Sequence, residues 1–281
     1  MRLLKQNFSF LMITLLVISC NKTEPPTNLT VKTLGVTNDQ GNLVTFNALV
    51  SGSSSGGFVY ATTPNPTIEE SEQAVIASFV DTMTATAIVE PSTTYYIRAY
   101  AWENSFDVVY GNEITYETGL AIGQEYEGGL IAYFFEEGDP GYVSGEQHGI
   151  IMAEEVLGTD VAWGCEGTSI SEATGIEIGI GKSNTAAIVS NCGEAGIAAK
   201  LCSDLVLNGY SDWYLPSHDE LRAIDSNEEH IDGISHGFYF SSSQYNSNQA
   251  WAVYVFPPPS VTLPEAYSKS FGQKVMAVRN F

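Results

Sequence analysis

A run of serines and a histidine beside two acids are the first candidates for chemistry in this sequence. Ser241-Ser242-Ser243 offers three consecutive hydroxyls, and His218 precedes Asp219 and Glu220. A nucleophilic serine held at a strand-to-helix elbow requires a Gly-x-Ser-x-Gly pattern, and none surrounds this run. His218 could act as a general acid or base, but Ser217 and Glu220 have the spacing of a capping box. That spacing places His218 in a first helical turn, where polar side chains generally face solvent, so we expect the protein not to be an enzyme.

Candidate ligands for a metal ion gather in one acidic segment. Its members are Asp225, Glu228, Glu229, His230, Asp232 and His236. The two histidines lack the regular spacing of a zinc site, and the acids lack the Asp-x-Asp-x-Asp-Gly pattern of an EF-hand. Gly179-x-Gly181 is not a phosphate loop, because no Lys-Ser or Lys-Thr follows at the Walker spacing. We predict no cofactor and no dedicated metal site, and leave loosely bound Ca²⁺ open.

Two tryptophans and three polar residues are the candidates for contact with a ligand. Trp163 and Trp251 could stack on the face of a sugar ring, whereas large aromatic side chains are more often buried. Ser241, Ser242 and Gln244 could supply polar contacts, and tight packing beside a strand is the alternative for the serines. We take these five residues as the ligand-binding candidates.

The N-terminus has the order of features found in an export signal. Arg2 and Lys5 give a positive start, the apolar run Phe8 to Ile18 follows, and Ser19 stands before Cys20. The run is shorter than the roughly 20 residues that span a bilayer, and it fits the apolar region of a secretory signal. Ser19-Cys20 resembles the lipobox of bacterial lipoproteins, which implies cleavage before Cys20 and lipidation of its thiol. An ordinary signal peptide or a buried N-terminal helix is the alternative.

Three further cysteines lie in the second half of the chain. With Cys20 assigned to the lipid, Cys165, Cys192 and Cys202 remain, and an odd number in an oxidising compartment implies one disulfide and one unpaired thiol. Cys202 falls in a helix-like run, where a small buried thiol packs well. Cys165 and Cys192 both lie beside glycines in loops, so we favour that pair.

The composition excludes some classes of partner. The formal charge is −22, which argues against binding to nucleic acid and against direct adsorption to anionic lipid. Aromatic residues make up 11% of the chain, and Tyr is the commonest of them. Exported chains rich in Tyr, Ser, Thr and Gly are usually β-structures with many polar tips, which suit contact with a glycan or a protein.

Residues 31–119 show short alternating runs separated by turn residues, the pattern of an antiparallel sandwich. The expected strands are Leu43–Val50, Gly57–Ala61, Tyr95–Ala101 and Ile114–Tyr116. Phe58-Val59-Tyr60, Asn65-Pro66-Thr67, the segment Pro91 to Ala101 and Tyr110-Gly111-Asn112-Glu113 resemble the fibronectin type III-like modules common in exported Bacteroidetes proteins. The resemblance implies an all-β sandwich that acts as a spacer.

Beyond a hinge at Gly119 to Gly123 the pattern changes to α+β. The expected strands are Leu130–Phe135, His148–Ala153, Gln249–Val255 and Lys274–Arg279. The expected helices are Glu194–Leu207, ended by Asn208-Gly209, and one that opens at Ser217 with its capping box.

Residues 120–281 carry a second resemblance. The motifs are Tyr126-x-Gly128-Gly129-x-Ile131-x-Tyr133, His148-Gly149, Trp163-Gly164-x-x-Gly167, Ile178-Gly179-x-Gly181-x-x-Asn184-Thr185, Ala198-Ala199-x-x-Cys202, Gly209 to Leu221, Ser241-Ser242-Ser243, Ala250-Trp251 and Val278-Arg279-x-Phe281. In this order they resemble the C-terminal domain family of the Legionella collagen-like adhesin. The resemblance implies a loop-rich, C-type lectin-like fold and a role in adhesion or ligand binding. Phe240 and Gln244 depart from the pattern, because a Trp usually precedes the serine run and an acid usually follows it.

That adhesin is reported to bind sulfated glycans, and recognition of such ligands needs basic residues. Residues 120–281 contain six Lys and Arg against 22 acids. We therefore expect a neutral glycan, a protein or a Ca²⁺-bridged ligand.

The whole chain is thus expected to be a lipid-anchored protein of the outer membrane or cell surface. We predict a signal peptide at 1–19, a tether at 20–30, a fibronectin type III-like sandwich at 31–119 and a C-type lectin-like recognition domain at 120–281. A structural role in a surface complex is the first alternative. An enzyme that uses Cys192 or Cys202, as in the formylglycine-generating enzymes that this domain distantly resembles, is the second.

Overall fold

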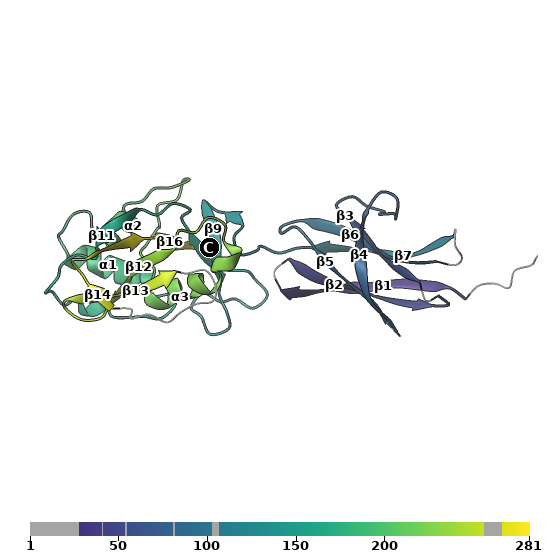
Figure 1. Cartoon of the computed structure of the whole chain (residues 1–281), viewed down its shortest axis with the longest axis horizontal. Coiled ribbons are helices and arrows are strands. Elements are labelled where there is room, and N and C mark those ends of the chain that lie inside the picture. Colours follow the sequence, from purple (N-terminus) through teal and green to yellow (C-terminus); the bar gives the residue numbers. More distant parts are fainter. Residues whose placement is uncertain (1–27, 41, 54, 81, 103–106, 256–265) are drawn as a thin grey trace, which may run out of the picture.

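The computed structural model describes residues 28–40, 42–53, 55–80, 82–102, 107–255 and 266–281. The proposed signal peptide and lipidated Cys20 lie outside the described residues. The fold is mostly β-sheet, and no described helix is long and apolar enough to cross a membrane. Two bodies lie end to end along the long axis in Figure 1. We name residues 30–117 the proximal body, residues 125–281 the distal body, and residues 118–124 the joint.

The proximal body contains seven strands in one hydrogen-bonded series. They are β1 (Thr30–Gln40), β2 (Leu43–Ser51), β3 (Gly56–Ala61), β4 (Glu72–Val80), β5 (Thr82–Ile88), β6 (Thr94–Trp102) and β7 (Val108–Glu117). Their order is β1-β2-β5-β4-β3-β6-β7, and all neighbours are antiparallel. Strand β4 pairs with β3 through its first residues and with β5 through its later ones, so it joins the two halves of the series.

Alternation along the strands builds the core of the proximal body. In β2, Val44, Phe46 and Ala48 are buried and the residues between them are not, as expected when successive side chains point to opposite faces. Phe46 contacts Phe58 and Tyr60, with ring centroids 5.6 and 5.3 Å away. Strand-by-strand alternation therefore supplies one continuous apolar layer.

The described residues of the distal body form two sheets and three α-helices. Its strands are β8 (Glu125–Tyr126), β9 (Gly129–Phe134), β10 (Gly149–Met152), β11 (Gly158–Ala162), β12 (Gly237–Gln244), β13 (Gln249–Val255), β14 (Ala266–Ser268), β15 (Gly272–Val275) and β16 (Val278–Asn280). Its helices are α1 (Gly181–Asn191), α2 (Ala198–Ser203) and α3 (His218–Ser226), with short 3₁₀ turns η1 (Ser171–Ala173) and η2 (Glu228–His230). The sheets have the orders β16-β10-β9-β8 and β11-β15-β12-β13-β14.

Helices cover both faces of the five-stranded sheet. Phe240 of β12 belongs to the core cluster that contains α1 and α2, whereas the adjacent Tyr239 belongs to the cluster that contains Leu221 and Ile224 of α3. Because neighbouring strand residues point to opposite faces, α3 and the α1–α2 pair lie on opposite sides of this sheet. The buried layers on both sides hold β12 and β13 firmly in place.

Two expected elements of the distal body differ in the structure. The expected helix Glu194–Leu207 is reduced to α2, because Gly196 has a positive φ of 69° and interrupts the helical backbone before Ile197. The expected strand Lys274–Arg279 is divided between the two sheets. Its first part pairs with β11 and its last part with β10.

Candidate functional site

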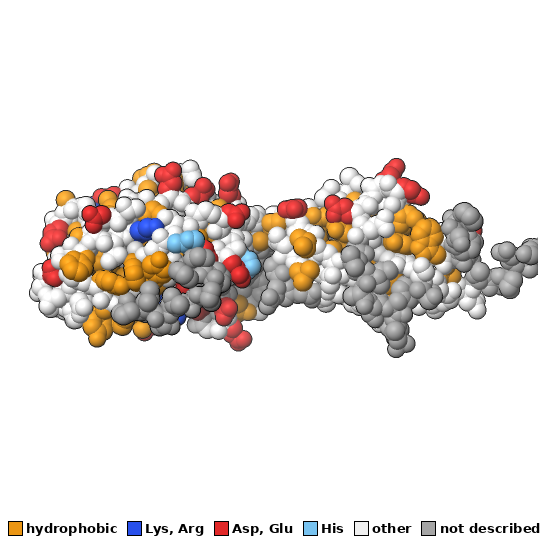
Figure 2. All heavy atoms as spheres, viewed as in Figure 1, with side chains coloured by type: hydrophobic (Ala, Val, Ile, Leu, Met, Phe, Trp, Pro, Cys, Tyr) orange, Lys and Arg blue, Asp and Glu red, His pale blue; other side chains and the backbone are white. Residues whose placement is uncertain are grey.

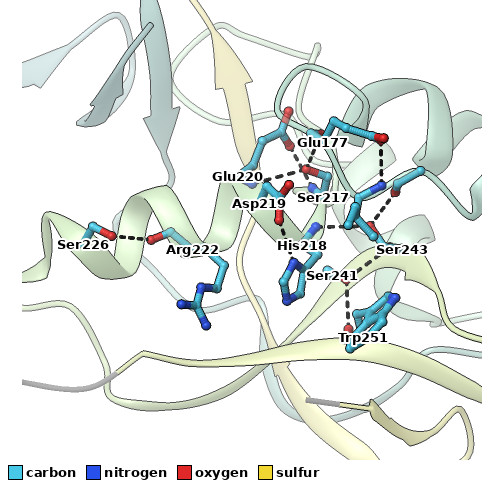
Figure 3. Close-up of polar contacts among 12 residues, drawn as sticks. Glu177, Ser217, His218, Asp219, Glu220, Arg222, Ser226, Ser241, Ser243 and Trp251 are labelled. Carbon is cyan, nitrogen blue, oxygen red and sulfur yellow. Dashed lines mark hydrogen bonds and ion pairs between the residues drawn. The ribbon is translucent and has the colours of Figure 1, made fainter. Parts of the chain in front are cut away.

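Helix α3 begins at a fully formed cap. The Ser217 hydroxyl accepts from the Glu220 backbone N–H at 3.2 Å, and the Glu220 carboxylate accepts from the Ser217 N–H at 2.7 Å. This confirms the predicted capping box. Figure 3 shows the cap beside the residues that follow it on α3 and those on β12 and β13.

The Glu220 carboxylate also explains the Gly179-x-Gly181 motif. It accepts from the Gly179 N–H at 2.9 Å, and a Cβ at Gly181 would lie 2.2 Å from its Oε2. Glu220 is fully buried, and burial raises the pKa of this carboxyl above its ordinary value. The motif therefore helps to position the start of α3.

Three aromatic side chains lie together next to the cap of α3, partly exposed at the surface. The His218 ring is 5.2 Å from the Trp251 ring, and Trp251 makes an edge-to-face contact with Tyr245 at 4.8 Å. Tyr245 is 53% exposed and Trp251 is partly exposed. We name His218, Tyr245 and Trp251 the aromatic shelf.

Hydrogen bonds position each member of the shelf. His218 is held by its backbone N–H, which donates to the Ser243 hydroxyl at 3.1 Å, and by its Nδ1, which is 2.8 Å from Asp219 Oδ1. The tight turn after β12 holds Tyr245, whose N–H donates to the Gln249 carbonyl at 3.0 Å. The Trp251 carbonyl accepts from the Ser241 hydroxyl at 2.9 Å. The shelf is therefore rigid at its base and open at Tyr245.

A cleft opens beside α3. It has a volume of about 490 Å³. Its lining consists of Ile122, Tyr133, Phe134, Glu136, Ile178, Asp219, Arg222, Ala223, Ser226 and Asn227. Asp219 thus lines the cleft and also contacts His218 of the shelf. An elongated ligand could contact both across the first turn of α3.

Four of the five predicted ligand-binding residues are buried and do not reach the surface of the structure. Trp163 is fully buried, and its indole Nε1 donates to the Ser241 carbonyl at 2.9 Å. Ser241 and Ser242 are also fully buried. The serine run ties β12 to its neighbours, and only Trp251 of the predicted set reaches the surface.

Gln244 belongs to a buried polar cluster rather than to a ligand site. It is 3% exposed, and its Oε1 accepts from Lys269 Nζ at 2.7 Å and from the Ile170 N–H at 2.9 Å. The same ammonium lies 4.3 Å from the centre of the Trp163 ring. Desolvation lowers the pKa of Lys269 to about 8. Neither Lys269 nor Tyr245 was among the candidate residues predicted from the sequence.

Cys165 and Cys192 form a disulfide, the pairing favoured from their loop positions. Cys202 is unpaired and fully buried. The two disulfide sulfurs and Glu194 are the one group of three or more metal-ligating residues found among the described residues. Because metal binding by cysteine requires the thiolate, this group does not fit a metal while the disulfide is intact.

An internal contact between Glu228 and His236 partly orders the acidic segment. Glu228 is 7% exposed, and its Oε1 lies 2.5 Å from His236 Nε2. His230 lies against its neighbour Glu229, with 3.5 Å between nitrogen and oxygen. The histidines therefore have separate acidic partners and do not converge on one point.

No protein-family model matches this sequence, and a search of curated proteins finds no match either.

Proposed function

We propose that this protein is an exported, lipid-anchored recognition protein that uses the aromatic shelf to hold a neutral glycan or a protein. The single observation that carries the proposal is the contact between Trp251 and the exposed Tyr245 at the tip of a rigid hairpin. The two rings meet at 74°, so they form the two sides of an apolar corner, and each side chain also carries a polar group.

The excess of acidic side chains on the distal body favours an uncharged ligand over a polyanion. Acidic side chains are spread over the visible face of the distal body in Figure 2, and basic ones are few. Two of the six basic residues of this part of the chain are also buried, namely Lys269 and Arg279. Arg279 is paired with Asp212 and Glu127. A polyanion would meet repulsion here, whereas the carboxylate of Asp219 could accept hydrogen bonds from sugar hydroxyls.

The arrangement of the chain supports a spacer and a recognition module. In this proposal the lipid at Cys20 anchors the N-terminus, as the lipobox resemblance implies. The proximal body is a fibronectin type III-like spacer, and the strand β4 that bridges β3 and β5 suits a two-layered sandwich. The distal body is the C-type lectin-like module farthest from the membrane, at the outer membrane or cell surface.

Binding of the full chain to an array of neutral and acidic glycans tests the proposal. We expect neutral glycans to bind. We also expect Trp251→Ala and Tyr245→Ala each to weaken binding by about 5-fold or more, because truncation of an important interface residue costs more than about 1 kcal/mol. Trp102→Ala in the proximal body is the matched control and should bind normally. Absence of glycan binding, together with no protein recovered by cross-linking in intact cells that depends on Trp251, would contradict the proposal.

A structural role in a surface complex makes a different prediction. In that case, cross-linking in cells would recover protein partners whose contacts do not change in Trp251→Ala.

A further inference from the structure

The joint is anchored to both bodies by hydrogen bonds. On the proximal side, the Ser92 N–H donates to the Gly119 carbonyl at 2.9 Å, and the Thr118 N–H donates to the Thr93 carbonyl at 3.0 Å. On the distal side, the Gly123 N–H donates to the Ile131 carbonyl at 2.8 Å. The joint is therefore not a free linker at either end.

The side chain of Gln147, which belongs to the distal body, makes two hydrogen bonds to the backbone of Leu120 in the joint. Its Oε1 accepts from the Leu120 N–H at 2.7 Å, and its Nε2 donates to the Leu120 carbonyl at 3.0 Å. The amide thus pairs with both polar groups of one backbone residue, as a neighbouring strand would. A Cβ at Gly119 would lie 2.5 Å from Gln147 Oε1. Glycine at position 119 leaves the space that this contact needs.

A further hydrogen bond connects the distal end of the joint to the proximal body. Gln124 Nε2 donates to the Ser92 hydroxyl at 3.0 Å, and its Oε1 accepts from the Ala121 N–H at 3.1 Å. Ser92 lies in the turn between β5 and β6, whereas Gln124 immediately precedes β8.

Apolar packing at the same place is limited. Leu120 and Ile122 pack against the distal core, but a cleft of about 350 Å³ opens beside the joint. Its lining is Ser92, Thr93, Thr94, Glu117, Thr118, Gly119, Leu120 and Gln147. Six of the eight lining residues have polar side chains, so apolar packing does not fill this part of the space beside the joint.

We infer that the joint is a rigid connection closed by Gln147, which fixes the angle between the proximal and distal bodies. This departs from the usual expectation that domains joined by a short glycine-containing segment move relative to each other. The inference does not depend on the ligand of the shelf. It concerns how the distal body is held away from the proximal one.

Distance measurements between spin labels on the two bodies test the inference. The labels are placed on the full chain in detergent through Glu69→Cys and Glu155→Cys, both at exposed positions. Cys165 and Cys192 are joined in a disulfide and Cys202 is buried, so these three do not react with the label.

We expect one narrow distance distribution in the otherwise native chain, and a distribution about two-fold broader or more in Gln147→Ala, because two hydrogen bonds are lost. Gly119→Ala should broaden it as well, since the added methyl displaces the Gln147 amide. Gln273→Ala in β15 is the matched control and should leave it narrow. If Gln147→Ala misfolds, Gln147→Glu replaces it, because the carboxylate keeps the acceptor for Leu120 and loses the donor. A broad native distribution, or an unchanged one in a folded Gln147 variant, would overturn the inference.

Discussion

The stability costs of Trp163→Phe and Trp251→Phe distinguish a tryptophan with a structural role from one at the proposed ligand site. The change removes the indole N–H that donates to the buried Ser241 carbonyl, and an unsatisfied buried acceptor costs about 1–3 kcal/mol. It also weakens the contact between the ring and the Lys269 ammonium, a contact worth about 0.5–2 kcal/mol when desolvated. We therefore expect the free energy of unfolding of the distal body to fall by about 2–4 kcal/mol. Trp251→Phe keeps an aromatic ring at a partly exposed position and should cost less than about 1 kcal/mol.

Urea unfolding followed by tryptophan fluorescence measures both variants. Three of the four tryptophans, Trp163, Trp213 and Trp251, lie in the distal body, so the signal reports mainly on that part. The midpoint should move to lower urea for Trp163→Phe at an unchanged m value, which would indicate a change in stability alone. Equal costs for the two variants, within about 0.5 kcal/mol, would refute the assignment of Trp163 to the core.

Three further changes probe the interior of the distal body. Glu220→Ala leaves the backbone N–H groups of Ser217 and Gly179 without their acceptor, and should lower the free energy of unfolding by about 2–5 kcal/mol in urea, whereas the exposed Glu137→Ala should cost less than about 0.5 kcal/mol. The pKa of Lys269 is about 8, below its ordinary value of 10.5. The unfolded chain therefore binds more protons between these two values, and the free energy of unfolding should rise with pH across that window. Thermal melting from pH 7.5 to 9.5 should show this rise in the native chain and not in Lys269→Met, and an identical slope in both proteins would contradict the burial of the ammonium. Reduction of the disulfide between Cys165 and Cys192, which are 27 residues apart, should lower stability by about 3.5 kcal/mol on the chain-entropy estimate, and an unchanged melting temperature after complete reduction would count against the bond.

Local patterns in the sequence predict β2, β3 and β6 of the proximal body closely, cover part of β7, and give no prediction for β1, β4 and β5. The expected strands Leu43–Val50, Gly57–Ala61 and Tyr95–Ala101 fall within one residue of β2, β3 and β6 at each end. Alternation and turn residues are sufficient in this region, because each strand has one buried face. The register shifts and the path of β4 depend on pairing between distant segments, which local patterns do not contain.

The distal body is less predictable, because its sheets are covered on both sides. Helix α1 was missed: its buried residues include Gly181, Asn184 and Thr185, so it lacks a clear apolar stripe. The capping box at Ser217 was predicted correctly, because a cap is a short-range pattern.

In the candidate site too, local patterns predict some features and packing between distant segments decides the others. Trp163 and Trp251 each follow an alanine, and only the packing of the sheets buries the first and leaves the second partly exposed. Tyr245 is separated from the serine run by Gln244, and its position before the turn residues Asn246 and Asn248 was the one available signal that it would lie at a hairpin tip.

The indole N–H resonances of the full chain test the proposed recognition site most directly. The chain has four tryptophans, so a ¹⁵N–¹H correlation spectrum contains four such signals, one for each ring. Addition of a neutral glycan that binds should shift the signal of Trp251 and leave those of the buried Trp163 and Trp213 in place. A shift confined to other tryptophans, with Trp251 unchanged at saturating ligand, would contradict the aromatic shelf as the site of recognition.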